Sequence, residues 1–188
     1  MARLTYAMGV SLDGYITDAD GDFGWGAPDE ALHRYYNEQT RGLRGFVFGR
    51  RVYELMEPHW PRLARDEAAG GAEAEFARIY VGIPRLVVSD TLADVPDGVT
   101  LVRRADAAAQ VRRLKEAGEG RLGIGGATLA AALFDLIDEF ELRVHPVLVG
   151  GGTPYFPPLG DRAELRLVGS RTLSGVVILR YERAGAGS

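Results

Sequence analysis

The chain has 188 residues, a formal net charge of −4 at pH 7 and no cysteine. This length suffices for one well-packed domain, and the acidic balance argues against a dedicated nucleic-acid-binding protein, which usually presents a basic face. Without cysteine there is neither a disulfide framework nor a cysteine–zinc site, and three scattered histidines do not predict a metal cluster. No targeting pattern opens the chain and no apolar run is long enough to span a bilayer, so we expect a cytoplasmic protein.

The first segments predict a buried strand and a polar loop. Residues 4–10 form an apolar run that indicates a strand, and residues 11–16 leave it through an Asp-Gly turn. The following residues, 18–26, are rich in Gly and Asp apart from Phe23 and Trp25. Such a loop is either an Ω-loop packed on itself or a mobile lid over a site, and the sequence leaves both open.

Alternating helices and strands follow. Pro28, Asp29 and Glu30 begin a helix that ends near Gly42 or Gly45, because proline suits the first helical position and acids favour the first turn. The further predicted elements are a strand at 46–48, a short helix at 52–56, a loop and an exposed helix within 62–80, strands at 85–89 and 99–102, a helix capped by Asp106 and ending at Gly118, and a strand that ends at Gly125 and leads into a helix.

The last part of the chain changes pattern. Residues 140–149 alternate as an antiparallel strand does, and strands at 165–169 and 176–181 make a hairpin. The whole predicts a single three-layer α/β domain over residues 1–183, with a largely parallel sheet and an antiparallel C-terminal hairpin at one edge. Residues 184–188 are predicted to be a disordered tail.

The stretch from Leu122 to Phe134 carries the main indication of a binding site. A short apolar run ends in Gly125 and Gly126, and an Ala/Leu-rich helical pattern follows at once. Glycine lets a ligand approach the backbone, and the first turn of a helix offers unpaired N–H groups that suit a phosphate. We interpret this turn as the pyrophosphate cradle of a nucleotide cofactor. The alternative is a tight strand–helix connection without a ligand.

The ends of the other predicted strands favour the cradle. Strands that end at Val10, Gly49, Ser89 and Gly125 are expected to meet at the carboxyl edge of the sheet, where folds of this class bind ligands. His145 is expected to be a strand residue that packs the sheet rather than a ligand-binding residue.

Four pieces of the chain, taken together, carry a resemblance to a known family. They are Ser11–Ile16, Phe48–Glu54, Ile124–Leu129, and Asp138–Glu139 leading to His145–Gly152. In this order they resemble the dihydrofolate-reductase-like family, and more closely the reductase domain of bacterial riboflavin biosynthesis and its stand-alone relatives. The similarity covers residues 4–181. It implies a reductase that takes a hydride from NADPH and works as a homodimer.

The resemblance assigns a set of residues to the cofactor. Gly49, Arg50 and Val52 would meet its phosphates where the second strand enters its helix, although relatives often have threonine at the position of Val52. For Arg50 the alternative is a surface ion pair. Ser89 would lie beside the adenosine ribose. The residues of the twin-glycine turn that would hold the pyrophosphate are Gly125, Gly126, Ala127, Thr128 and Leu129.

Asp90 leaves the choice of nicotinamide cofactor open. Relatives commonly carry a basic residue at this position, and an acid there would repel the 2′-phosphate of NADPH or accept a hydrogen bond from the free ribose hydroxyl of NADH. Arg103 or Arg104 would restore the positive charge if the fold brings them near. NADPH is the expected cofactor, with NADH as the alternative.

On the substrate side the resemblance points to Asp13, Trp25 and Glu30. The run from Trp25 to Glu30 is similar to one in dihydrofolate reductase, whose carboxylate holds the pterin ring and helps to protonate it. Asp13 matches an aspartate that faces the substrate in riboflavin reductases. Both carboxylates are therefore candidate catalytic residues. The alternatives are a helix acid facing water for Glu30 and a turn aspartate bonded to its own backbone for Asp13.

Ile124 departs from the riboflavin reductases, which usually have a glutamate directly before the paired glycines. The departure shifts the match toward the stand-alone relatives and weakens 5-amino-6-(5-phosphoribosylamino)uracil as a candidate substrate. We expect an NADPH-dependent reductase of a small heteroaromatic or imine substrate, with no nucleic-acid or membrane partner. The alternatives are a non-catalytic dinucleotide-binding or ligand-sensing module and a dihydrofolate reductase.

Overall fold

The computed structural model of the chain describes residues 1–184. Residues 185–188, which make up most of the predicted tail, lie outside the described residues. The described chain ends at Ala184, whose N–H donates to the carbonyl oxygen of Glu164 at 3.0 Å. Within these residues, no helix combines the length and the apolar character that a membrane crossing requires.

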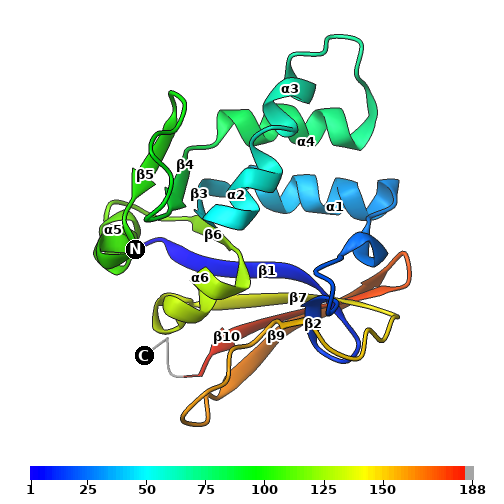
Figure 1. Cartoon of the computed structure of the whole chain (residues 1–188). Coiled ribbons are helices and arrows are strands. Elements are labelled where there is room, and N and C mark those ends of the chain that lie inside the picture. The colour runs from blue at the N-terminus through cyan, green and yellow to red at the C-terminus, as the bar shows by residue number, and fades with distance from the viewer. Residues whose placement is uncertain (185–188) are drawn as a thin grey trace.

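The main sheet of the described residues has eight strands, and a separate pair of short strands lies beside it (Figure 1). The strands are β1 (Arg3–Ser11), β2 (Tyr15–Thr17), β3 (Leu43–Gly49), β4 (Arg85–Val88), β5 (Val99–Val102), β6 (Arg121–Gly125), β7 (Glu139–His145), β8 (Thr153–Pro154), β9 (Leu165–Leu173) and β10 (Val176–Arg183). The order in the main sheet is β5-β4-β3-β6-β1-β7-β10-β9, and β2 pairs with β8. The strands from β5 to β7 pair in parallel, and β10 is antiparallel to both β7 and β9. The predicted fold class, with its antiparallel hairpin edge, is confirmed.

Helices cover both faces of this sheet (Figure 1). The helical segments are η1 (Gly24–Gly26), α1 (Glu30–Arg41), α2 (Arg50–Met56), α3 (Trp60–Ala64), α4 (Gly71–Gly82), α5 (Arg104–Glu116), α6 (Ala127–Ala132) and η2 (Phe134–Leu136). Successive residues of β3 point to opposite faces of the sheet, so neighbouring residues pack against the helices on different faces. Val47 packs in a cluster with Val111 of α5, whereas Phe48 packs with Tyr53 of α2 and Tyr80 of α4. The prediction that the 62–80 segment carries an exposed helix is wrong, because Tyr80 is fully buried.

Strand β7 corrects the prediction of an antiparallel strand at 140–149. It ends at His145 and pairs in parallel with β1, while its antiparallel partner is β10. The alternation that indicated an antiparallel strand has another cause. Glu141 and Arg143 form an ion pair at 2.9 Å whose side chains are largely buried, on the face that Tyr35 of α1 covers. The polar residues of β7 thus face a helix.

Tyr155, in the loop after β8, belongs to the core. It is fully buried, its ring centroid lies 4.4 Å from that of Tyr6, and its hydroxyl donates to the carbonyl oxygen of Tyr6 at 2.7 Å. This contact anchors the loop between β7 and β9 on the middle of the sheet.

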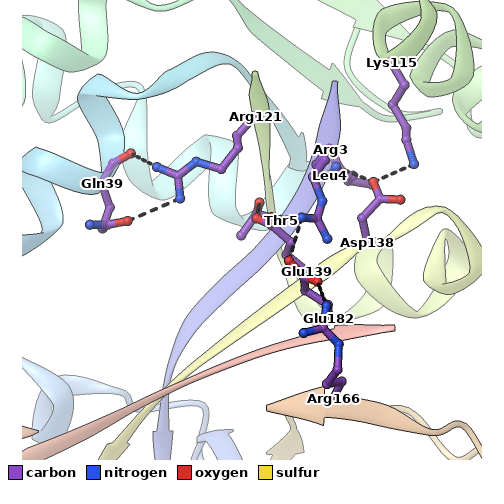
Figure 2. A network of polar contacts seen from close by, with 10 residues as sticks. All are labelled: Arg3, Leu4, Thr5, Gln39, Lys115, Arg121, Asp138, Glu139, Arg166 and Glu182. Atoms are coloured by element: carbon purple, nitrogen blue, oxygen red, sulfur yellow. Dashed lines mark hydrogen bonds and ion pairs between the residues drawn. The ribbon is translucent and has the colours of Figure 1, made fainter. Parts of the chain in front are cut away.

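Polar contacts tie the amino ends of β1 and β7 together (Figure 2). The carboxylate of Asp138 accepts hydrogen bonds from the backbone N–H of Leu4 at 2.7 Å and from Nζ of Lys115 at 2.6 Å. Arg3 donates to Glu182 of β10 at 2.6 Å. Three strands and α5 are joined at this edge, which leaves the opposite, carboxyl edge as the place for a ligand.

We predict that Asp138→Ala lowers the free energy of unfolding by about 2 kcal/mol, because a partly buried backbone N–H and an ammonium group lose their acceptor. The expected fall in Tm is about 4–8 °C for a chain of this size. Thermal and urea unfolding measure it. The exposed turn residue Asp97 provides the matched control, Asp97→Ala, which should change Tm by less than about 2 °C.

Candidate active site

The parallel strands bring their carboxyl ends to one edge of the sheet. The register places Ser11 of β1 opposite His145 of β7, and Phe48 of β3 opposite Gly125 of β6. Gly49 follows Phe48 directly and opens α2 as its N-cap residue. Parallel sheets bind ligands at this edge, so the residues around it are the candidates for a site.

The turns after β3 and β6 touch each other at this edge. A Cβ atom built on Gly126 would lie 3.8 Å from the backbone nitrogen of Gly49 and 3.3 Å from Cγ2 of Val52. Gly126 also has a φ of +103°, which residues with a side chain rarely adopt. The structure therefore brings the twin-glycine turn and the Arg50 turn together, and it does so backbone against backbone.

Two helices begin beside this contact. Helix α2 follows Gly49 and α6 follows Gly126, and neither N-cap residue has a side chain that could accept a hydrogen bond. The first N–H groups of an α-helix have no acceptor within the helix. In α6 these are the N–H groups of Ala127, Thr128 and Leu129. Their position at the strand edge suits an anionic group such as a phosphate.

Arg50 and Val52 make different contacts. Arg50 is half exposed, and its Nη1 lies 3.1 Å from Oε1 of Glu54, which is the surface ion pair that the sequence left open. Exposed pairs of this kind are weak, so Arg50 can exchange Glu54 for another anion. A Cβ atom built on Gly125 would lie 3.3 Å from Cγ1 of Val52, and one built on Gly126 would lie 3.3 Å from its Cγ2. Val52 therefore packs the two turns and offers no polar atom.

In the turn after β4, the Ser89 hydroxyl forms hydrogen bonds with the backbone of the same turn. Ser89 is buried, and its Oγ accepts hydrogen bonds from the backbone N–H groups of Thr91 at 3.1 Å and Leu92 at 3.0 Å. Arg103 donates to the carbonyl oxygens of Ser89 and Leu92, both at 2.9 Å. The fold thus brings Arg103 beside Ser89, although they lie far apart in the sequence.

Asp90 caps helix α5. Its Oδ1 accepts a hydrogen bond from the backbone N–H of Arg104 at 2.9 Å, and its Oδ2 lies 3.6 Å from Nε of the same residue. This contact explains why α5 begins at Arg104, so the predicted cap at Asp106 is wrong. With Arg103 alongside, two positive charges accompany the one negative charge of Asp90.

Asp13 holds a loop. Its carboxylate accepts hydrogen bonds from the backbone N–H groups of Val149 at 3.2 Å and Gly150 at 2.8 Å. Hydrogen bonding from the Ser11 hydroxyl, together with these two N–H groups, keeps the pKa of Asp13 below its ordinary value. The side chain is therefore ionised at neutral pH, which suits an acceptor rather than a proton donor.

Trp25 and Glu30 lie near the same edge but make separate contacts. The indole N–H of Trp25 donates to the carbonyl oxygen of Asp22 at 3.3 Å, and its ring meets the His145 ring edge to face, with 5.7 Å between centroids. Glu30 is exposed and pairs with Arg34 at 2.5 Å, one turn further along α1. The contacts of Glu30 match the alternative of a helix acid facing water.

The structure shows a buried polar group on β7 that the sequence-based prediction of the site did not include. Oε2 of Glu141 accepts a hydrogen bond from the Tyr35 hydroxyl at 2.9 Å, and the Arg143 guanidinium lies 3.9 Å from the ring centroid of Tyr36. Burial, with the charge of Glu141, raises the pKa of Tyr35 to about 12, so this hydroxyl stays a donor. The polar residues at every second position of β7 were the sequence signal for this group.

His145 ends β7 at the same edge, as predicted, and its side chain is buried. Burial, and next the positive charge of Arg143, lower its pKa below the ordinary value, so the imidazole is neutral at pH 7. Among the described residues, none is a hydrogen-bond partner of its Nε2 atom. His145 contacts the ring of Trp25 but does not belong to the predicted set of site residues.

Comparisons with known proteins match nearly the whole chain. A sequence model of the RibD C-terminal domain matches residues 2–179. The chain is 28% identical over 189 residues to the uncharacterized protein YyaP of Bacillus subtilis (strain 168), covering 97% of this chain and 96% of YyaP. Among solved structures, a protein from Shewanella sp. PV-4 whose name places it in riboflavin biosynthesis has a TM-score of 0.69, with 26% identity, over 98% of this chain and 99% of that one. A dihydrofolate reductase from Enterococcus faecalis, complexed with NADP(H), has a TM-score of 0.58, with 14% identity, over 96% of each chain.

We predict that Asp13→Asn speeds hydrogen exchange at the amides of Val149 and Gly150 by about fivefold at pH 7, because a neutral amide replaces a charged acceptor. In the unchanged protein the same amides are protected above the ordinary carboxyl pKa. Protection is lost as the pH falls through the lowered pKa of folded Asp13. Amide exchange followed by NMR measures both effects. Asp97→Asn serves as the control, and equal exchange in the two variants would show that Asp13 does not hold the loop.

Proposed function

The chain belongs to the RibD C-terminal domain family, and we propose that it is a reductase that uses NADPH to reduce a small heteroaromatic or imine-bearing substrate. The contact between the Gly49 and Gly126 turns carries the proposal. It gathers the N–H groups of two helix beginnings at the ligand-binding edge of the sheet, and a side chain at 126 would fill the space between them. When bound, the cofactor supplies the hydride.

The residues at the edge fit a dinucleotide. The backbone at Gly126, Ala127 and Thr128 would hold the diphosphate, and Arg50 would add a bidentate contact after leaving Glu54. At the far end, Arg103 and Arg104 surround the Ser89–Asp90 turn. Their excess of positive charge supports NADPH over NADH, in spite of the acid at position 90.

The two candidate carboxylates take different parts in this proposal. Asp13, ionised and bonded to the 149–150 backbone, would orient the substrate through the loop that it fixes. Glu30, exposed and paired with Arg34, is free to turn toward a bound ring and to deliver a proton from water. Orientation of the two reactants would then supply much of the rate.

The substrate remains a class rather than one compound. Ile124 is buried in the core, so the place where riboflavin reductases usually have a glutamate offers no polar group here. This supports a substrate other than 5-amino-6-(5-phosphoribosylamino)uracil, which the proposal keeps as a first compound to assay.

A homodimer is part of the same proposal. Strand β9 is one of the two edge strands of the sheet, and its Leu167 and Val168 are exposed. An open edge with exposed apolar residues is the kind of surface that a second copy covers.

A second candidate is a module that binds the dinucleotide without turnover. The engagement of Asp13 by the loop backbone favours it, because a carboxylate that already accepts two backbone hydrogen bonds is not a preformed proton donor. Oxidation of NADPH in the presence of any candidate substrate, followed at 340 nm, would separate the two, since a sensing module shows binding alone.

We predict that the purified protein binds NADPH and that Gly126→Asp weakens this binding by more than about 100-fold, since a carboxylate would stand where the phosphate is held. Fluorescence enhancement of NADPH measures the affinity. Gly98→Asp is the control, because Gly98 has a similar φ of +85° but open space around it. Equal affinities in the two variants, or no binding by the original chain, would contradict the proposal.

We also predict that Arg104→Ala weakens NADPH binding by about tenfold and leaves NADH binding within about twofold, because only NADPH carries the 2′-phosphate. Calorimetric titration with each cofactor measures the difference. Arg112→Ala, at an exposed position of α5, is the matched control. A loss of the same size for both cofactors would show that Arg104 acts on the fold rather than on the phosphate.

A further inference from the structure

His145 carries a polar atom that the fold leaves without a partner. Its side chain is 5% exposed, and no described residue forms a hydrogen bond with its Nε2. Folded proteins pair nearly all of their buried polar atoms, because an unpaired one costs stability. A buried atom of this kind at a ligand-binding edge therefore indicates a partner that arrives with the ligand.

The surroundings of Nε2 place it beside the predicted substrate residue. A Cβ atom on Gly9 would lie 3.4 Å from Nε2, and one on Gly26 would lie 3.7 Å from it. The ring of Trp25 meets the imidazole edge to face. The nitrogen is thus between the end of β1 and the turn that carries Trp25.

The loop that covers His145 is bonded mainly to itself. Among residues 18–27, four backbone hydrogen bonds stay within the loop, from the N–H groups of Asp18, Gly21, Gly26 and Ala27 to the carbonyl oxygens of Asp22, Asp18, Phe23 and Gly24, respectively. None of the ten residues is buried. The loop therefore has the internal bonds of an Ω-loop, and it can shift as a unit without breaking the sheet. A shift of its Trp25 turn would uncover Nε2.

The charges around the imidazole select what it can bind. Arg143, two residues earlier on the same face of β7, is paired with Glu141, and in the described part of the chain no carboxylate forms a hydrogen bond with Nε2 of His145. A neutral imidazole nitrogen donates or accepts a single hydrogen bond, according to its tautomer. It therefore matches the N–H or C=O group on the edge of a neutral, planar ring.

We propose that His145 is a substrate-binding residue, whose Nε2 forms a hydrogen bond with the N–H or C=O edge of a planar nitrogen heterocycle that lies against Trp25. This inference rests on the proposed reductase function and narrows its substrate class. Heterocycles of the uracil and lactam type carry such an edge, whereas simple imines do not.

Two substitutions and one spectroscopic measurement test it, with 5-aminouracil and dihydrofolate as probes in the presence of saturating NADP⁺. His145→Phe should weaken binding of the better probe by about tenfold, and His145→Gln, whose amide keeps a polar atom, should stay within about threefold of the original chain. His145→Phe should also raise Tm by a few degrees, at most about 5 °C, because it removes the unpaired nitrogen. If His145 were needed only for packing, His145→Phe would lower Tm instead of raising it.

The spectroscopic measurement needs no variant. In the ¹⁵N-labelled protein, the Nε2 resonance of His145 should shift when the probe is added and stay unchanged when NADP⁺ is added alone. The inference is overturned if neither probe moves this resonance, or if His145→Phe binds the probe as well as the original chain does. Failure of the proposed function is a separate result, since it appears as the absence of NADPH binding to the original chain.

Discussion

The contact between the turns after β3 and β6 depends on missing side chains. Helix α2 lies on one face of the sheet and α6 on the other, so their beginnings can meet only at the carboxyl edge. They meet because Gly126 turns with a positive φ and has no side chain; a Cβ atom there would lie 3.8 Å from the backbone nitrogen of Gly49. Any side chain at 126 would strain the backbone and push against Val52. The same geometry that closes the core at this edge presents unpaired N–H groups to solvent.

The two ends of the sheet differ in how completely their polar groups are paired. At the amino end, Asp138 and Arg3 join strands that are far apart in the sequence (Figure 2). Along β7, Glu141 and Arg143 form a satisfied pair, whereas the Nε2 atom of His145 has no partner among the described residues. Buried charges need good partners to avoid a large desolvation cost, and Glu141 has them in Arg143 and a tyrosine hydroxyl. On β7, the buried atom without a partner among the described residues therefore lies at the carboxyl edge of the sheet.

Local patterns predicted the fold class, the helix that starts at Glu30 and the twin-glycine turn, because propensity and periodicity act over a few residues. Local patterns could not predict contacts between residues that lie far apart in the sequence. The cap that Asp90 provides to α5 acts across 14 residues, and the parallel pairing of β7 with β1 across more than 130. The alternation in β7 was visible in the sequence, but only the packing of Tyr35 shows that a helix lies opposite. Nothing in the composition indicated that the Nε2 atom of His145 would be left without a partner.

The loop of residues 18–27 has a consequence for how such proteins diversify. Its hydrogen bonds are nearly all internal, and the sheet loses no pairing when the loop changes. Changes in the length or aromatic content of this loop would therefore leave the turns after β3 and β6 in place. One inherited scaffold would in this way serve many metabolites, with chemical novelty confined to a short exchangeable segment.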